Sequence, residues 1–173
     1  QWAVHQVDEG GRCGGLRRVP VHVVAKLPFN TRTMSAPTPY LNFPGTCEEA
    51  FNFYRTVFGA ELSYIGRFKE MPAEYTVPAE HAEKVMHATL MLNGQPFLMG
   101  SDAPEGFGPP FNAGNNVHLS LSPADEAEAK KWYDALREGG LVAMELTPTF
   151  WAKLFAMVRD RYGIHWMISY GQP

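Results

Sequence analysis

Two histidines and an aspartate are the side chains whose types first suggest chemistry in this sequence. His87 and His118 lie in stretches that alternate like strands, and Asp102 follows a third such stretch. Two imidazoles and a carboxylate can move protons near neutral pH or hold a divalent metal ion. Each histidine could equally be a sheet residue that is hydrogen-bonded to a neighbour. A catalytic role for the three is therefore one of two interpretations.

Cys47 is a second candidate for reactive chemistry. It falls at the first position of an expected helix, where the helix dipole can lower the pKa of a thiol. No base is apparent near it in the sequence, so we expect a structural cysteine. The other cysteine, Cys13, makes neither a disulfide framework nor a metal-knuckle spacing with it. This cysteine usage is typical of a reducing compartment, and we expect a cytoplasmic protein.

The stretch 39–62 predicts the elements that would position the first of these groups. Residues 40–43 read as a short strand, and Thr46 with Glu49 forms a capping-box pattern at a helix start. Gly59 is suited to end this helix, and residues 61–67 resume as a strand. The helix has one apolar stripe, which comprises Ala50, Phe53, Tyr54, Val57 and Phe58.

The middle of the chain predicts a loop, a hairpin and a long connection. Residues 68–83 are polar and interrupted by prolines, which indicates a loop that can cover a site. Residues 85–92 and 95–100 read as two strands, and Asn93-Gly94 between them is a hairpin turn signal. Residues 101–115, rich in glycine and proline, connect the two halves.

The second half repeats the first. Residues 117–121 predict a strand, and Ser122 with Pro123 predicts a helix start. An apolar stripe then continues to Gly139-Gly140, and its Trp132 and Tyr133 could serve an interface between chains. Three more strands are expected at 141–146, 153–160 and 165–169, with a turn at Tyr162-Gly163.

The predicted fold class is α+β, with two tandem βαβββ modules whose curved sheets surround a central cup. The modules span about 38–102 and 115–170 within a single domain at 34–173. Residues 1–33 differ in composition and are interpreted as a leader, tag or upstream segment, although 19–27 could add a strand.

Composition limits the classes of partner. The chain has 173 residues, which is one-domain size, with a hydrophobic fraction of 45%. A net charge of −3 without a basic run excludes general attraction to nucleic acid or anionic lipid. No apolar run approaches the roughly 20 residues that a membrane span needs. We expect a soluble protein that binds neither nucleic acid nor membrane.

Four segments carry a family resemblance: LNFPGTCEEAFNFYRTVFGAE, KVMHATLMLNGQPFLMGSD, NVHLSLS and YGIHWMIS. Together with the repeated modules, they make residues 39–170 resemble the vicinal oxygen chelate superfamily. More narrowly, the chain resembles its PhnB-like branch of glyoxalase, bleomycin-resistance and dioxygenase proteins, often labelled demethylubiquinone methyltransferase-like. The resemblance implies the fold but not one activity, because this fold hosts many chemistries.

In metal-dependent members, the resemblance implies ligands on the first, fourth, fifth and eighth strands. The positions that match fall near Thr38 on the first strand, at Asn116 on the fifth and at Met167 on the eighth. These residue types are poor ligands for hard or borderline divalent ions. The resemblance therefore argues against glyoxalase I activity. Methyl transfer is also not expected, because no glycine-rich strand-to-helix turn for a cofactor is visible.

We therefore expect a protein that binds a small organic molecule in an apolar cup, without a resident cofactor. The alternative is a metal-dependent lyase, isomerase or dioxygenase that uses His87, Asp102 and His118, so a divalent metal stays possible. Superfamily members with two modules commonly pair, which makes a homodimer the expected assembly. The residues expected to contact the ligand are Tyr40, Asn42, Met91, Phe97, Met99, Phe107, Phe111, Asn116, Ser120, Trp151 and Met167.

Overall fold

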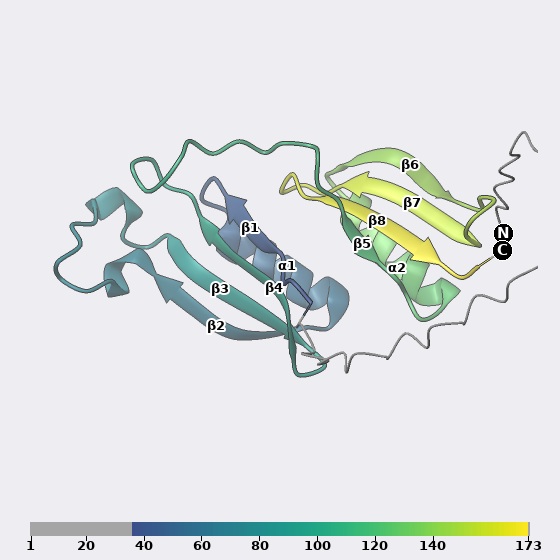
Figure 1. The fold of residues 1–173 in the computed structure, drawn as a ribbon, viewed down its shortest axis with the longest axis horizontal. Coiled ribbons are helices and arrows are strands. Elements are labelled where there is room, and N and C mark those ends of the chain that lie inside the picture. Colours follow the sequence, from purple (N-terminus) through teal and green to yellow (C-terminus); the bar gives the residue numbers. More distant parts are fainter. Residues whose placement is uncertain (1–35, 173) are drawn as a thin grey trace, which may run out of the picture. The chain divides into compact units, whose positions relative to one another are not determined.

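The computed structural model describes residues 36–172, which form two βαβββ modules (Figure 1). The predicted α+β class with tandem βαβββ modules is confirmed, because each module builds one four-stranded sheet. The expectations for residues 1–33, including the strand at 19–27 and Cys13, lie outside the described residues. No helix within 36–172 is long and apolar enough to cross a membrane.

The first module follows the predicted boundaries closely. It comprises β1 (Tyr40–Phe43), α1 (Cys47–Phe58), β2 (Glu61–Arg67), β3 (Val85–Leu92) and β4 (Gln95–Asp102). The sheet order is β1-β4-β3-β2, with β1 parallel to β4 and the other pairs antiparallel. Asn93 and Gly94 both have positive φ, at 52° and 74°, as the predicted tight hairpin requires. The loop after β2 contains two short 3₁₀ turns, η1 (Phe68–Glu70) and η2 (Ala79–His81).

The second module repeats this connectivity with a shorter first strand. It comprises β5 (Leu119–Leu121), α2 (Glu126–Arg137), β6 (Leu141–Thr147), β7 (Leu154–Arg159) and β8 (His165–Tyr170). The sheet order β5-β8-β7-β6 matches that of the first sheet. Because β5 begins at Leu119, the predicted strand positions Asn116 and His118 belong to the segment that leads into it.

The capping side chains predicted for the two helices, Thr46 and Ser122, are both wrong. Thr46 occupies the N-cap position of α1, but its side chain makes no capping hydrogen bond. The backbone N–H of Cys47, the first residue of the helix, donates to Oδ1 of Asp102 at 2.9 Å. The carboxylate at the end of β4 therefore meets the positive end of the helix dipole. The second helix begins at Glu126 rather than at Pro123, because Asp125 caps it by accepting from the N–H of Glu128.

The core lies between each sheet and its helix, and it continues from one module to the other. Gly59 ends α1 in the left-handed conformation, as predicted. The predicted apolar stripe of this helix included Phe53, which is only half-buried, whereas Phe51 is fully buried. Trp132 of α2 packs edge-on against Phe58 of α1, with ring centroids 5.6 Å apart. Aromatic side chains of α1 and α2 thus form a contact between the two modules of one chain.

Asp160, which follows β7, is the polar centre of the contact between modules. Its carboxylate is 2% exposed and accepts four hydrogen bonds. Two come from the hydroxyl of Tyr54 on α1 and the indole N–H of Trp166 on β8, both at 2.7 Å. Two come from the backbone N–H groups of Tyr162 at 2.9 Å and Ile164 at 3.0 Å. This buried charge is fully hydrogen-bonded, as a stable fold requires.

The expected interface role of Tyr133 is wrong. Tyr133 is 6% exposed, and its hydroxyl donates to the carboxylate of Glu145 within the second module. The apolar stripe of α2 was identified correctly, but Tyr133 is turned onto its own sheet and is not exposed to a partner chain. Trp132 is likewise engaged, with Phe58.

Each sheet has a helix on one face only, and the other face is lined by large side chains. The register places Tyr40, Met99, Thr89 and Tyr64 in one row across the first sheet. In the second sheet, Ser120, Met167, Met157 and Met144 form the corresponding row. We call these the helix-free faces. Their residues are half-buried or exposed, with Tyr40 at 46% and Tyr64 at 50%.

Candidate functional site

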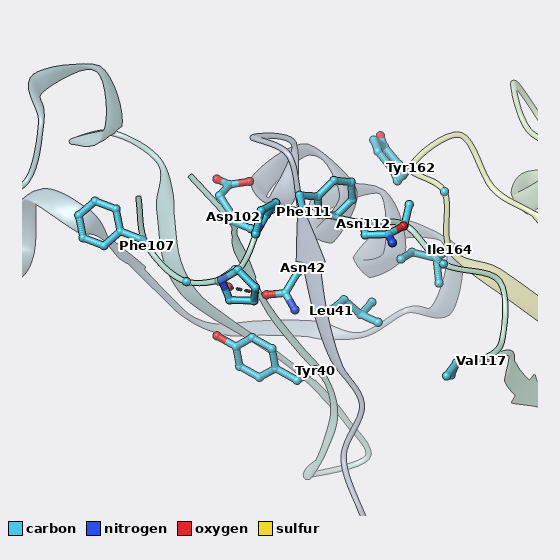
Figure 2. Close-up of a pocket in the computed structure, with 18 of the residues that line it drawn as sticks. Tyr40, Leu41, Asn42, Asp102, Phe107, Phe111, Asn112, Val117, Tyr162 and Ile164 are labelled. Atoms are coloured by element: carbon cyan, nitrogen blue, oxygen red, sulfur yellow. Dashed lines mark hydrogen bonds between the residues drawn. The ribbon is translucent and has the colours of Figure 1, made fainter. Parts of the chain in front are cut away.

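A pocket of about 860 Å³ lies beside β1, under the linker that joins the modules (Figure 2). One wall is the first strand, with Tyr40, Leu41 and Asn42. A second wall is the linker, which contributes Phe107, Phe111 and neighbouring glycines and prolines. The third wall comes from the turn between β7 and β8 and from the start of β8. The pocket is therefore built from both modules and from the connection between them.

Six of the predicted site residues line this pocket: Tyr40, Asn42, Asp102, Phe107, Phe111 and Asn116. Alternation along β1 was enough to place Tyr40 and Asn42 on one face. The two phenylalanines belong to a glycine- and proline-rich linker, where an apolar residue has no strand or helix to pack into. Phe107 lies against Phe68 with ring centroids 5.1 Å apart, which anchors the linker over the first module.

The other predicted ligand contacts lie elsewhere. Met99, Met167 and Ser120 are on the helix-free faces. Met91 is paired with Glu61 and Pro96 in the first sheet. Phe97 packs edge-on against Phe58, with centroids 5.2 Å apart, and so contributes to the core. Trp151 packs between Phe150 and Phe155. Alternation assigns the strand residues among these to a face but does not say which part of that face borders a cavity, and Trp151 lies between β6 and β7.

Several lining residues carried no signal in the sequence analysis. Ser101 was assigned to the connection, although it still belongs to β4. Tyr162, Ile164 and His165 were read only as a turn and the start of the last strand, yet they form the third wall. Their place in the site follows from the contact between modules through Asp160, and sequence spacing does not report such long-range contacts.

His87 lies on the helix-free face of the first sheet, between two tyrosines. Its Nδ1 is 3.2 Å from the hydroxyl of Tyr40, and its Nε2 is 3.1 Å from the hydroxyl of Thr89. The rings of Tyr40 and Tyr64 are centred 5.6 and 5.9 Å from the imidazole. His87 does not line the pocket itself but contacts it through Tyr40. It matches the interpretation of a hydrogen-bonded sheet histidine.

Asp102 is committed to the fold rather than to a ligand. It is 5% exposed, and its second oxygen accepts from the backbone N–H of Val85 at 2.8 Å while the first accepts from Cys47. One carboxylate thus joins the end of β4 to the starts of α1 and β3. Each oxygen of Asp102 accepts one backbone N–H, so the fold fixes the orientation of this carboxylate at the pocket wall.

His118 contacts a second histidine rather than the predicted pair. Its ring meets that of His165 edge-on, with centroids 5.0 Å apart, where β5 and β8 begin side by side. Burial lowers the pKa of His165 below its ordinary value, and the neighbouring His118 and Arg159 lower it further. His165 lines the pocket, so at neutral pH it presents an uncharged imidazole there.

The residues present do not fit the divalent metal that the fold family implies. Within residues 36–172, no three His, Cys, Asp or Glu side chains form a group that could hold a metal ion. The proposed set of His87, Asp102 and His118 is therefore not assembled, since Asp102 is hydrogen-bonded to backbone and each histidine is bonded or stacked elsewhere. Asn116 and Met167 remain poor substitutes for imidazole and carboxylate. We derive no chemical step through a metal.

Cys47 is a structural residue, as the sequence suggested. The thiol is buried, and burial raises its pKa well above the ordinary value, with Asp102 and Glu48 adding to the effect. The dipole of α1 is thus outweighed by desolvation and by two carboxylates.

Comparison with known proteins identifies relatives over most of the chain. Residues 35–169 match the family model described as 3-demethylubiquinone-9 3-methyltransferase. Protein YjdN of Escherichia coli is 33% identical over 140 residues, which cover 76% of this chain and 92% of YjdN. Protein PA1353 of Pseudomonas aeruginosa has a crystal structure that is 37% identical, with a TM-score of 0.71, and covers 81% of this chain and 100% of that one.

Two further structures bear on the fold. The PhnB protein of Bacillus cereus, described as a putative 3-demethylubiquinone-9 3-methyltransferase, is 29% identical with a TM-score of 0.65, covering 79% of this chain and 100% of its own. The fosfomycin resistance protein FosX of Listeria monocytogenes is only 10% identical, with a TM-score of 0.55 over 80% of this chain and 94% of FosX. This last likeness concerns the fold alone.

Proposed function

The chain belongs to the family described as 3-demethylubiquinone-9 3-methyltransferase, in the PhnB-like branch of the vicinal oxygen chelate fold, and from this membership we propose that it binds a small organic molecule in the pocket beside β1. The observation that carries the proposal is the pocket itself, with a volume of about 860 Å³ and walls of aromatic and amide side chains. Such a volume and lining suit a drug-sized or smaller ligand.

The ligand should be flat and largely apolar. Phe107 and Phe111 of the linker and Tyr40 of β1 offer ring surfaces to it (Figure 2). Aromatic side chains that bury ring area against a ligand contribute mainly through apolar surface removed from water. The linker wall carries these rings on a segment with positive-φ glycines at Gly106 and Gly108. Glycine adopts this backbone conformation without strain, which shapes the path of the linker along the pocket.

The proposal does not include methyl transfer, despite the family description. The turn from β1 into α1 has a single glycine, Gly45, between Pro44 and Thr46. The N-terminus of α1, where a cofactor's anionic group could bind, already receives the carboxylate of Asp102. These residues do not fit a nucleotide-type cofactor at that turn.

We also propose a homodimer in which the helix-free faces are covered by a second copy. Antiparallel sheets tolerate water on one face when that face is polar. Here the row Met144, Met157 and Met167 and the exposed Tyr40 and Tyr64 make it largely apolar. Light scattering at micromolar concentration tests the assembly, and a monomeric mass would contradict it. A cytoplasmic location is part of the same proposal, supported by the buried free thiol of Cys47.

Naphthalene is a suitable probe for the pocket, because it is flat, neutral and apolar. We expect ligand-observed NMR to show binding, and Phe111→Ala to weaken it about tenfold through lost ring contact. Phe150→Ala is the matched control, since Phe150 is 87% exposed and does not line the pocket. Absence of naphthalene binding to the wild-type chain, or equal losses in the two variants, would refute the proposed function.

A further inference from the structure

Asn42 is the polar side chain of the β1 wall whose orientation is set by the sheet. The register of β1 with β4 places it beside Ser101. The hydroxyl of Ser101 donates to Oδ1 of Asn42 at 3.2 Å, which Figure 2 shows as a dashed line. The amide oxygen is therefore engaged, and the Nδ2 hydrogens remain to donate toward the pocket. A donor held on a strand and oriented by a second residue is a suitable recognition group.

Two hydroxyl groups and the carboxylate of the walls are engaged away from the pocket. The hydroxyl of Tyr40 is bonded to His87, and that of Tyr162 donates to Glu49 at 3.1 Å. Both oxygens of Asp102 accept backbone N–H groups. The amides of Asn112 and Asn116 lie on the linker, where no strand fixes them. Asn42 and the His165 imidazole at the start of β8 are thus the strand side chains left to donate, and Asn42 is the one that a hydrogen bond from Ser101 orients.

The charge of the pocket favours an uncharged ligand. Among its lining residues, all within the described part of the chain, no lysine or arginine occurs, and Asp102 is the single acidic residue. Burial lowers the pKa of the His165 imidazole, which favours its uncharged form. A carboxylate or phosphate ligand would lose water here without gaining a counterion, which is costly. A carbonyl oxygen, by contrast, needs only one donor.

We propose that Asn42 determines ligand specificity by donating from Nδ2 to an uncharged carbonyl oxygen on an aromatic ligand. The inference rests on the proposed binding function and names the class of ligand for that pocket. It assigns Ser101 the role of a positioning residue, because Ser101 acts on the ligand only through the amide of Asn42.

Three naphthalene-based probes test this assignment: naphthalene, methyl naphthyl ketone and naphthoate. For the wild-type chain, we expect the ketone to bind about fivefold more tightly than naphthalene, the effect of one neutral hydrogen bond. Naphthoate should bind about tenfold more weakly than naphthalene, because its charge is desolvated without a partner. Titration by NMR at neutral pH gives all three dissociation constants.

The variants separate donation by Asn42 from a general effect on the fold. Asn42→Leu should remove the ketone's advantage over naphthalene, measured as the ratio of the two dissociation constants within the same variant. Ser101→Ala should reduce the same advantage, since the amide is then free to rotate. Asn52→Leu is the matched control, because Asn52 lies on α1 outside the pocket. It should leave all three constants unchanged.

The outcomes distinguish this inference from the proposed function. If naphthalene binds but the ketone has no advantage, or if Asn42→Leu keeps that advantage, the inference is overturned and the binding function stands. Tighter binding of naphthoate than of the ketone would also overturn it. If none of the probes binds, the proposed function itself fails and takes this inference with it.

Discussion

Asp160→Ala is expected to be the most damaging single substitution at the contact between modules. The change leaves four hydrogen-bond donors without their acceptor: the Tyr54 hydroxyl, the Trp166 indole N–H, and the N–H groups of Tyr162 and Ile164. The rings of Tyr54 and Trp166 are 0% and 1% exposed, so water cannot easily replace the carboxylate.

The magnitude follows from the cost of unpaired buried donors. Each buried donor left unsatisfied costs about 1–3 kcal/mol, and neighbouring losses are not additive. We expect the free energy of unfolding to fall by about 4 kcal/mol, a large part of the 5–15 kcal/mol that is typical of a domain. Tyr54→Phe removes one donor and keeps the other three satisfied. It should therefore cost only about 1 kcal/mol.

Urea denaturation followed by circular dichroism measures both variants. The reasoning predicts a lower midpoint with an unchanged slope for each, and little added cost of Tyr54→Phe in the Asp160→Ala background, since the hydroxyl has already lost its partner. A loss below about 1 kcal/mol for Asp160→Ala, or full additivity of the two changes, would refute the account of a buried hydrogen-bonded carboxylate.

Two other predictions concern packing and pH. Gly100→Ala should lower the free energy of unfolding by about 2 kcal/mol in urea titrations, since its Cβ would lie 2.7 Å from the Leu41 carbonyl oxygen and 2.8 Å from the Phe51 ring. Gly114→Ala, whose Cβ meets nothing closer than 3.5 Å, is the control, and equal effects would contradict the clash. For His165 the folded pKa is lowered, so the folded state binds fewer protons, and stability present above its ordinary value of 6.5 is lost as pH falls toward the folded value. NMR titration should give a pKa for His165 below 6.5, and a value above it would reverse the sign of this term.

Local patterns predicted most of the fold because they are set by neighbours in the sequence. The alternation at residues 40–43 and 85–92 and the Asn93-Gly94 turn report which faces are buried and where the chain must reverse. The helix starts were missed for a different reason. Asp102 accepts from the first N–H of α1, that of Cys47, whereas a Thr46 cap would accept from the second or third. In the second helix, Asp125 caps in place of Ser122. Only the folded chain decides which acceptor reaches the free N–H groups.

Of the residues that line the pocket, the sequence predicted mainly those that lie on β1 or on the linker between the modules. Tyr40 and Asn42 follow from the alternation of β1, and Phe111 follows from its place in the linker. Tyr162 and Ile164 reach the pocket because Asp160 holds their turn against α1. Such a long-range contact leaves no periodic trace in one sequence. Phe97 was misassigned for the same reason, since an aromatic strand residue looks alike whether it faces a cavity or Phe58.

The long-range hydrogen bonds of α1 can form only in a fixed order while the chain is translated, because their acceptors lie far along the sequence. The acceptor of the first N–H of the helix, Asp102, is translated 55 residues after Cys47. The acceptor of the Tyr54 hydroxyl, Asp160, is translated 106 residues after Tyr54. While the ribosome is still making the first module, this helix lacks its N-terminal acceptor. Even when β4 has emerged, the Tyr54 hydroxyl lacks its protein acceptor until the end of β7 is translated. The first module thus depends on the second for the acceptor of the Tyr54 hydroxyl.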